Sequence, residues 1–135
     1  METLDTTSKT KNIMSRTTEV EIITSLERFE QNLGFLEPSL TISDLAQKLN
    51  TSIKYLSFIL NKHYLKDFNT YINELRIHYI VNKIESNKEY RSYKISYLAK
   101  ECGFSSHSKF SAIFKSVKGF SPSFFIEINE RNISM

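Results

Sequence analysis

The sequence is poor in the residues that build β-rich and covalently stabilised folds. Its 135 residues include three glycines, two prolines, one cysteine and no tryptophan. So few glycines and prolines disfavour a fold with many tight turns, and the lone cysteine, Cys102, excludes an intramolecular disulfide. No apolar run approaches the roughly 18–20 residues of a membrane-spanning helix, and no signal-peptide pattern opens the chain. We therefore expect a cytoplasmic protein of one domain, or of two very small ones that share a core.

The sequence also lacks the residue patterns that catalytic and metal sites need. The three histidines, His63, His78 and His107, do not combine with Cys102 at any spacing typical of metal ligands. Paired carboxylates, a nucleophile–base arrangement and a glycine-rich phosphate loop are missing as well. We expect no enzyme and no cofactor.

Charge is distributed unevenly along the chain. The net charge is +3, but residues 1–40 hold four Lys/Arg against seven Asp/Glu, and residues 41–135 hold the other fourteen against eight. The basic part of the chain therefore starts near residue 41. By itself this is weak evidence for an anionic partner.

Within the basic part, residues 42–60 and 95–114 resemble each other. The matched positions are Ile42 with Ile95, Ser43 with Ser96, Leu45 with Leu98, Ala46 with Ala99, and, after one inserted residue, Leu56 with Phe110, Ser57 with Ser111, Ile59 with Ile113 and Leu60 with Phe114. Each copy has a small residue in its first helix, followed four residues later by Asn50 or Gly103, which tolerate a left-handed turn. This is the pattern of a helix-turn-helix.

Hydrophobic spacing predicts an all-α fold of about seven helices, in which two helix-turn-helix subdomains are joined by a long central helix. The expected organisation is a flexible tail (1–16), an N-terminal helix and linker (17–40), a first helix-turn-helix (41–66), a connecting helix (67–87), and a second helix-turn-helix with a C-terminal helix (94–131). Gly34 is expected to stop the N-terminal helix, Thr41 and Asp44 to form a capping box, and the residues around Arg91 to form a polar loop.

The second helix of each copy is expected to bury one stripe and to expose the other. The inward positions are Leu56, Ile59, Leu60 and His63 in the first copy and Phe110, Ile113, Phe114 and Val117 in the second. The outward positions are Lys54, Ser57, Phe58, Asn61 and Lys62, and then His107, Ser108, Ser111, Ala112 and Lys115. A connecting helix of about 19 residues spans about 28 Å, close to the roughly 34 Å between successive major-groove faces. The two outward faces could therefore read adjacent major grooves.

The repeated part of the sequence and the helix between the copies resemble a known family. The stretches LAQKLNTSIKYLSFIL, FNTYINELRI and LAKECGFSSHSKFSAIFKSVKGFSPSFF are similar to the C-terminal double helix-turn-helix module of the AraC/XylS transcription regulators, over about residues 41–126. The resemblance implies double-stranded DNA as the partner and transcription regulation as the function. Residues 17–40 also resemble the segment that precedes this module in membrane-anchored regulators, so the chain could be the cytosolic part of one.

The resemblance also implies site residues. Base-reading positions fall on Lys54, Ser57 and Phe58 in the first unit and on His107, Ser108, Ser111 and Ala112 in the second, and the outward Asn61 joins them. Phosphate contacts are expected from Ser43, Lys62, Lys94, Lys109 and Lys115. Phe58 and Ala112 depart from the family's polar residues and could only contact a thymine methyl group. Leu65 replaces a common glycine.

Arg76 is expected to form a structural ion pair, with Glu101 as the candidate partner, and Cys102 to be a buried apolar residue rather than a redox sensor.

The favoured function is sequence-specific DNA binding by a regulator, most simply an activator, with RNA polymerase and an upstream sensor domain as further candidate partners. The alternative, favoured by an exposed Phe58, is a helical protein-interaction module without direct DNA readout.

Overall fold

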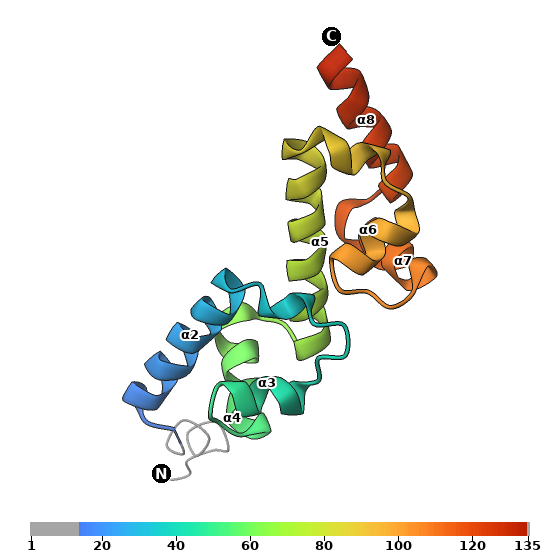
Figure 1. The fold of residues 1–135 in the computed structure, drawn as a ribbon. Coiled ribbons are helices and arrows are strands. Elements are labelled where there is room, and N and C mark those ends of the chain that lie inside the picture. Colours follow the sequence, from blue (N-terminus) through green and yellow to red (C-terminus); the bar gives the residue numbers. More distant parts are fainter. Residues whose placement is uncertain (1–13, 135) are drawn as a thin grey trace. The chain divides into compact units, whose positions relative to one another are not determined.

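The computed structural model describes residues 14–134, which form helices and turns without a β-strand (Figure 1). The seven α-helices of this part are α2 (Arg16–Gln31), α3 (Ile42–Lys48), α4 (Ile53–Ile59), α5 (Phe68–Ser86), α6 (Ile95–Glu101), α7 (His107–Lys118) and α8 (Pro122–Ser134). Shorter helical turns are η1 (Gly34–Leu36), η2 (Leu60–Tyr64, a π-helix) and η3 (Lys88–Ser92). The predicted all-α fold is confirmed. Among the described helices, none is both long and apolar enough to cross a membrane.

The described residues fold as two units, each with its own core. The first consists of residues 14–32 and 40–68, in which α2 and α3 both pack against α4. Its buried side chains include Ile22, Leu26 and Phe29 from α2, Leu45 and Ala46 from α3, and Leu56 and Ile59 from α4. Each helix of this unit therefore contributes its apolar face to one shared core.

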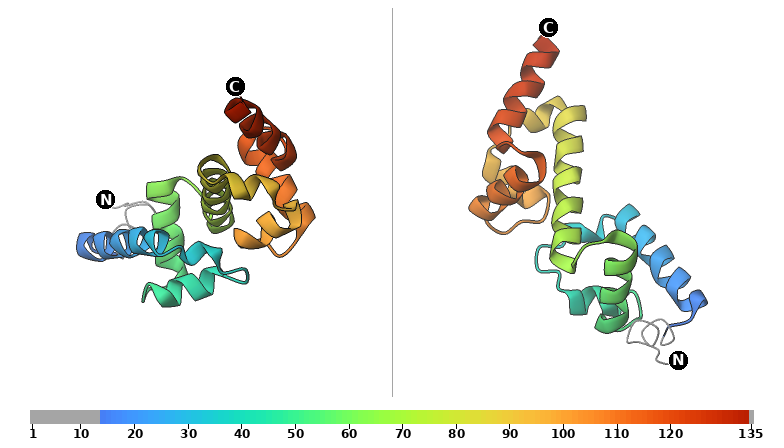
Figure 2. Two further views of the ribbon diagram at one scale, coloured as in Figure 1. Left: turned by 45° about the horizontal axis from the view of Figure 1, so that its top comes forward. Right: turned by 180° about the vertical axis from the view of Figure 1, so that it is seen from behind.

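The second unit consists of Leu33–Ser39 and residues 69–134. In this unit α6 and α7 lie beside α5, as both views of Figure 2 show. A row of aromatic rings runs through the core, with centroid distances of 5.5 Å from Phe104 to Phe110, 5.8 Å from Phe110 to Phe114 and 5.8 Å from Phe114 to Phe125. These contacts join the turn of the second helix-turn-helix to α7 and α8.

Both helix-turn-helix units have a left-handed turn, but only the first has a side-chain cap at the start of its first helix. Thr41 and Asp44 form the predicted capping box, since the amide of each residue donates to the side chain of the other at 3.0 Å. Asn50 and Gly103 both adopt the predicted left-handed conformation, with φ of 57° and 95°. Lys94, at the start of α6, makes no side-chain capping bond.

Leucines occupy two left-handed turn positions: Leu33, next to the glycine expected to stop the N-terminal helix, and Leu65, where the family commonly has a glycine. The N-terminal helix α2 ends at Gln31 with Asn32 as its C-cap, and the left-handed residue after the cap is Leu33 (φ 59°) rather than Gly34, which begins η1. Leu65 is also left-handed (φ 58°) and is 84% exposed. Residues 1–13 of the expected tail lie outside the described residues, whereas Met14 is buried and Ser15 caps α2.

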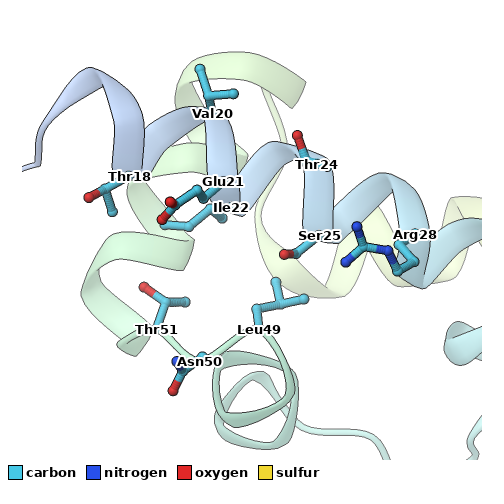
Figure 3. Close-up of a pocket in the computed structure, with 10 residues that line it drawn as sticks. All are labelled: Thr18, Val20, Glu21, Ile22, Thr24, Ser25, Arg28, Leu49, Asn50 and Thr51. Atoms are coloured by element: carbon cyan, nitrogen blue, oxygen red, sulfur yellow. The ribbon is translucent and has the colours of Figure 1, made fainter.

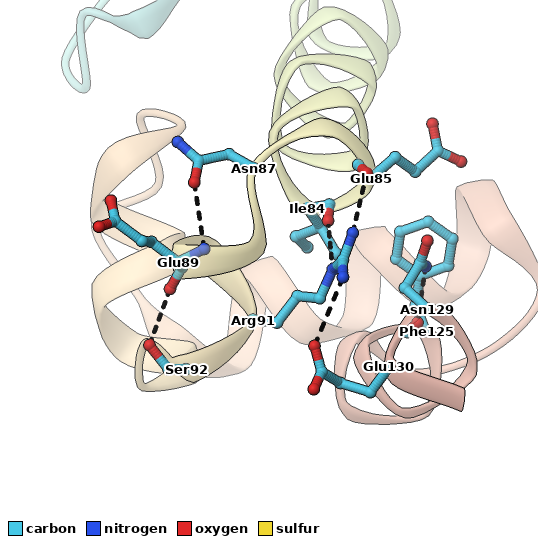
Figure 4. Close-up of polar contacts among 9 residues, drawn as sticks. All are labelled: Ile84, Glu85, Asn87, Glu89, Arg91, Ser92, Phe125, Asn129 and Glu130. Carbon is cyan, nitrogen blue, oxygen red and sulfur yellow. Dashed lines mark hydrogen bonds and ion pairs between the residues drawn. The ribbon is translucent and has the colours of Figure 1, made fainter. Parts of the chain in front are cut away.

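Buried arginines organise the second unit, and the sequence interpretation missed one of them. The predicted polar loop contains η3, from which Arg91 donates to the carbonyl oxygens of Ile84 at 2.8 Å and Glu85 at 2.9 Å (Figure 4). Arg91 also lies 3.5 Å from the Glu130 carboxylate of α8. Arg91 therefore binds the free carbonyl groups at the end of α5 and links them to α8.

Arg76 is structural, as predicted, but its partners are not Glu101. Its guanidinium donates to the carbonyl oxygens of Phe35 and Glu37, both at 2.7 Å, and lies 5.5 Å from the centre of the Phe104 ring. Glu101 instead accepts a hydrogen bond of 2.9 Å from the Tyr90 hydroxyl. Arg76 thus attaches the Leu33–Ser39 segment to α5.

Candidate nucleic-acid interface

The first candidate reading helix is α4 with its continuation η2. Ser52 caps α4 by accepting a 3.1 Å hydrogen bond from the Tyr55 amide. Of the predicted base-reading residues, Lys54 and Asn61 are exposed, whereas Ser57 and Phe58 are half-buried. The Asn61 side-chain amide donates to the Ser57 carbonyl at 2.9 Å, so this group already has a partner within the helix.

One inward position in this unit was wrong. His63 was expected to join the buried stripe of Leu56, Ile59 and Leu60, but it is exposed and its Nε2 lies 3.1 Å from Glu19 Oε2. The cause is η2, because a π-helical turn holds more residues than an α-helical turn and rotates position 63 away from the stripe.

The second candidate reading helix, α7, has the predicted faces. It begins after Ser106, whose hydroxyl accepts from the Lys109 amide at 3.1 Å, and ends at Gly119 with φ of 89°. Phe110 and Phe114 are fully buried. The predicted reading positions lie on the other side, where His107, Ser108 and Ala112 are exposed and Ser111 is half-buried.

The predicted phosphate-binding residues are all at the surface but are not equivalent. Ser43, Lys94, Lys109 and Lys115 are exposed. Lys62 is exposed too, yet its Nζ donates to Glu19 Oε2 at 2.7 Å. The sequence interpretation missed Glu19, because no local pattern connects residues that are 43 positions apart.

A groove of about 440 Å³ lies between α2 and the turn that joins α3 to α4 (Figure 3). Leu49, Asn50 and Thr51 line it on the turn side. The side formed by α2 carries one acid, Glu21, and one base, Arg28. With these opposite charges the groove is not the strongly basic surface that nucleic-acid phosphates require.

Cys102 is part of the core of the second unit. It is fully buried, and its Sγ donates to the Ala99 carbonyl at 3.6 Å. Burial raises the pKa of the Cys102 thiol to about 12, so that the reactive thiolate is suppressed at neutral pH. The prediction of a buried apolar role is confirmed.

Two short helices joined by a left-handed turn, present twice with one exposed helix face in each, define a double helix-turn-helix protein. A family model described as a helix-turn-helix domain matches residues 45–127, which is more than half of the chain. The chain therefore belongs to the AraC-type helix-turn-helix family, whose members are DNA-binding transcription regulators. No match was found among curated proteins.

Solved structures share the fold. The C-terminal domain of AraT, a response regulator from Geobacillus stearothermophilus, is 24% identical with a TM-score of 0.65, over 76% of this chain and 83% of that one. The C-terminal domain of the two-component response regulator yesN from Fusobacterium nucleatum is 22% identical with a TM-score of 0.63, over 76% and 98%. A transcriptional regulator from Chromobacterium violaceum with an AraC-type DNA-binding domain is 19% identical with a TM-score of 0.68, over 85% and 96%.

Proposed function

We propose that this chain binds double-stranded DNA sequence-specifically as part of a transcription regulator, with α4 and α7 as reading helices in adjacent major grooves. The observation that carries the proposal is the first turn of α7. It exposes His107, Ser108 and Lys109 directly after the Ser106 cap and contains no acidic residue. Side chains at the start of a recognition helix are the ones that reach base edges in the major groove.

The roles of the exposed residues follow from their chemistry. Histidine and serine can donate to or accept from base edges, and a lysine adds charge that favours any phosphate. His107, Ser108 and Ser111 in α7 and Lys54, Ser57 and Asn61 in the first unit are the proposed polar readers. Phe58 and Ala112 offer apolar contacts, and Ser43, Lys94, Lys109 and Lys115 are the proposed phosphate contacts.

Fluorescence anisotropy with a selected duplex and a scrambled duplex tests these roles. Lys109→Ala should weaken binding similarly on both and reduce the slope of log affinity against log salt by about 0.9. Ser108→Ala should weaken only the selected duplex, by about 1–3 kcal/mol at the base pairs it reads. Lys88→Ala is the matched control, since Lys88 is also an exposed lysine but lies in η3, outside the reading helices. Affinity that ignores salt and is unchanged in both test variants would contradict the proposal.

The observation that favoured the alternative, a protein-interaction module without DNA readout, does not hold in the structure. It was favoured by an exposed aromatic side chain at Phe58, but Phe58 is half-buried and the Lys62 ammonium lies 5.6 Å from its ring centre. Phe58→Ala separates the two roles, since a purely protein-contacting Phe58 leaves DNA affinity unchanged. Activation through RNA polymerase, an upstream sensor domain and a cytoplasmic location stay predictions.

A further inference from the structure

In the first unit, a carboxylate from α2 binds the end of the proposed reading helix. Glu19 Oε2 accepts a hydrogen bond of 2.7 Å from Lys62 Nζ and lies 3.1 Å from His63 Nε2. The side chain of Glu19 is 17% exposed, against 40% for Lys62. The hydrogen bonds from Lys62 and then His63 hold the pKa of the Glu19 carboxyl below its ordinary value, so Glu19 is charged at neutral pH.

An aromatic ring and a small hollow beside α2 hold the Lys62–Glu19 ion pair on the α2 side of the proposed reading helix. Lys62 lies over the ring of Phe58, with 5.6 Å between the ammonium and the ring centre. Both side chains line a hollow of about 250 Å³ together with Met14, Arg16 and Glu19, and Met14 is only 7% exposed. The ammonium of Lys62 is therefore held by a carboxylate and an aromatic ring at once.

We infer that Glu19 competes with DNA phosphate for Lys62 and so weakens the sequence-independent affinity of the first unit. The inference rests on the proposed DNA binding. A lysine adds to that affinity when it releases a counterion from a phosphate, and a lysine already neutralised by a carboxylate of its own chain must first break that pair. Glu19 consequently lowers the share of the first unit's DNA affinity that comes from phosphate contacts and raises the share that comes from base contacts.

The α2 helix also supplies a matched control for this inference. Glu19→Gln and Glu21→Gln each remove one negative charge from α2, so both change the overall field of the protein equally. Glu19 contacts Lys62, whereas Glu21 lines the groove on the other side, beside the turn of the helix-turn-helix. A difference between the two variants therefore reports the contact with Lys62 and not the net charge.

The experiment measures duplex affinity as a function of salt for the complete chain and its variants. Glu19→Gln should tighten binding to every duplex by roughly fivefold to tenfold at about 0.1 M salt and steepen the salt slope by about 0.9, the effect of one added phosphate contact. Glu21→Gln should change affinity by less than about twofold. Lys62→Ala alone should have a similarly small effect, and in the double variant it should cancel the gain from Glu19→Gln. Thermal unfolding of each variant verifies that it is folded.

Three results would overturn the inference. The first is an equal effect of Glu19→Gln and Glu21→Gln on DNA affinity. The second is a loss of affinity in Glu19→Gln, which would make Glu19 a residue that positions Lys62 for DNA. The third is a loss of affinity in Lys62→Ala as large as that in Lys109→Ala. Failure of the proposed function looks different. In that case the unmodified chain and Lys109→Ala both fail to bind any duplex, and both proposals fall together.

Discussion

At the residue scale, the two glycines with positive φ differ in what surrounds them. A Cβ atom on Gly103 (φ 95°) would lie 2.8 Å from Arg76 Nε and 3.0 Å from the Leu36 carbonyl oxygen. A Cβ on Gly119 (φ 89°) would meet nothing within 4 Å. The backbone conformation disfavours a side chain at both positions, but only at Gly103 would a side chain also collide with neighbouring atoms.

This difference predicts unequal costs of substitution. Gly119→Ala should lower the free energy of unfolding by about 1–2 kcal/mol, the cost of a left-handed non-glycine residue. Gly103→Ala should cost roughly 3 kcal/mol or more, because its methyl group also displaces the Arg76 guanidinium from the carbonyls it binds. Urea unfolding followed by circular dichroism measures both. Equal costs would show that Arg76 can move without loss.

Cys102 leads to a prediction about reactivity. At pH 8 a thiol whose pKa is raised to about 12 is ionised in only about one molecule in ten thousand, and here it is also fully buried. A disulfide reagent such as dithionitrobenzoate should therefore label the native protein only as fast as it unfolds, and should label it at once in concentrated urea. Complete labelling of the native protein within minutes would indicate a redox-accessible thiol.

At the scale of the element, helix caps determine how much of the fold the sequence predicts. The structure has α5 at Phe68–Ser86, against a predicted connecting helix of 67–87, because regular apolar spacing and turn residues indicate where this helix begins and ends. Leu33 and Leu65 could not be predicted as left-handed, since leucine disfavours that conformation. The π-turn that exposes His63 has no local signal either.

The uncapped α6 offers a substitution with opposite effects on stability and binding. Lys94→Ser should supply the missing cap and raise the free energy of unfolding by about 0.5–1 kcal/mol. The same change removes a proposed phosphate contact, so DNA affinity should fall by a few-fold. Lys100→Ser, in the last turn of the same helix, removes an equal charge without adding a cap, and should not stabilise. Urea unfolding and anisotropy on the same samples test the pair, and a Lys94→Ser protein that is no more stable would show that α6 needs no cap.

At the scale of the whole molecule, family and fold were predictable and long-range pairing was not. The repeat and the stretch from Leu98 to Pro122 identified the AraC-type module, which the family match confirms. The pairing of Glu19 with Lys62 joins parts of the chain that share no pattern, and the partners of Arg76 are backbone carbonyls, which carry no residue identity. The candidate site was thus predicted as a set of surface positions, without the contact that distinguishes Lys62 from the other lysines.

Sequence-specific DNA recognition is tested by a selection of binding sites from a library of random duplexes, performed with the unmodified chain. If α4 and α7 read adjacent major grooves, the selection should enrich a site with two short conserved elements whose centres lie about 10 base pairs apart, one turn of the duplex. The same selection with Ser108→Ala should relax the preference in one element and leave the other intact. Sequences that stay at the library background after repeated rounds, from a folded protein at moderate salt, would contradict sequence-specific DNA recognition.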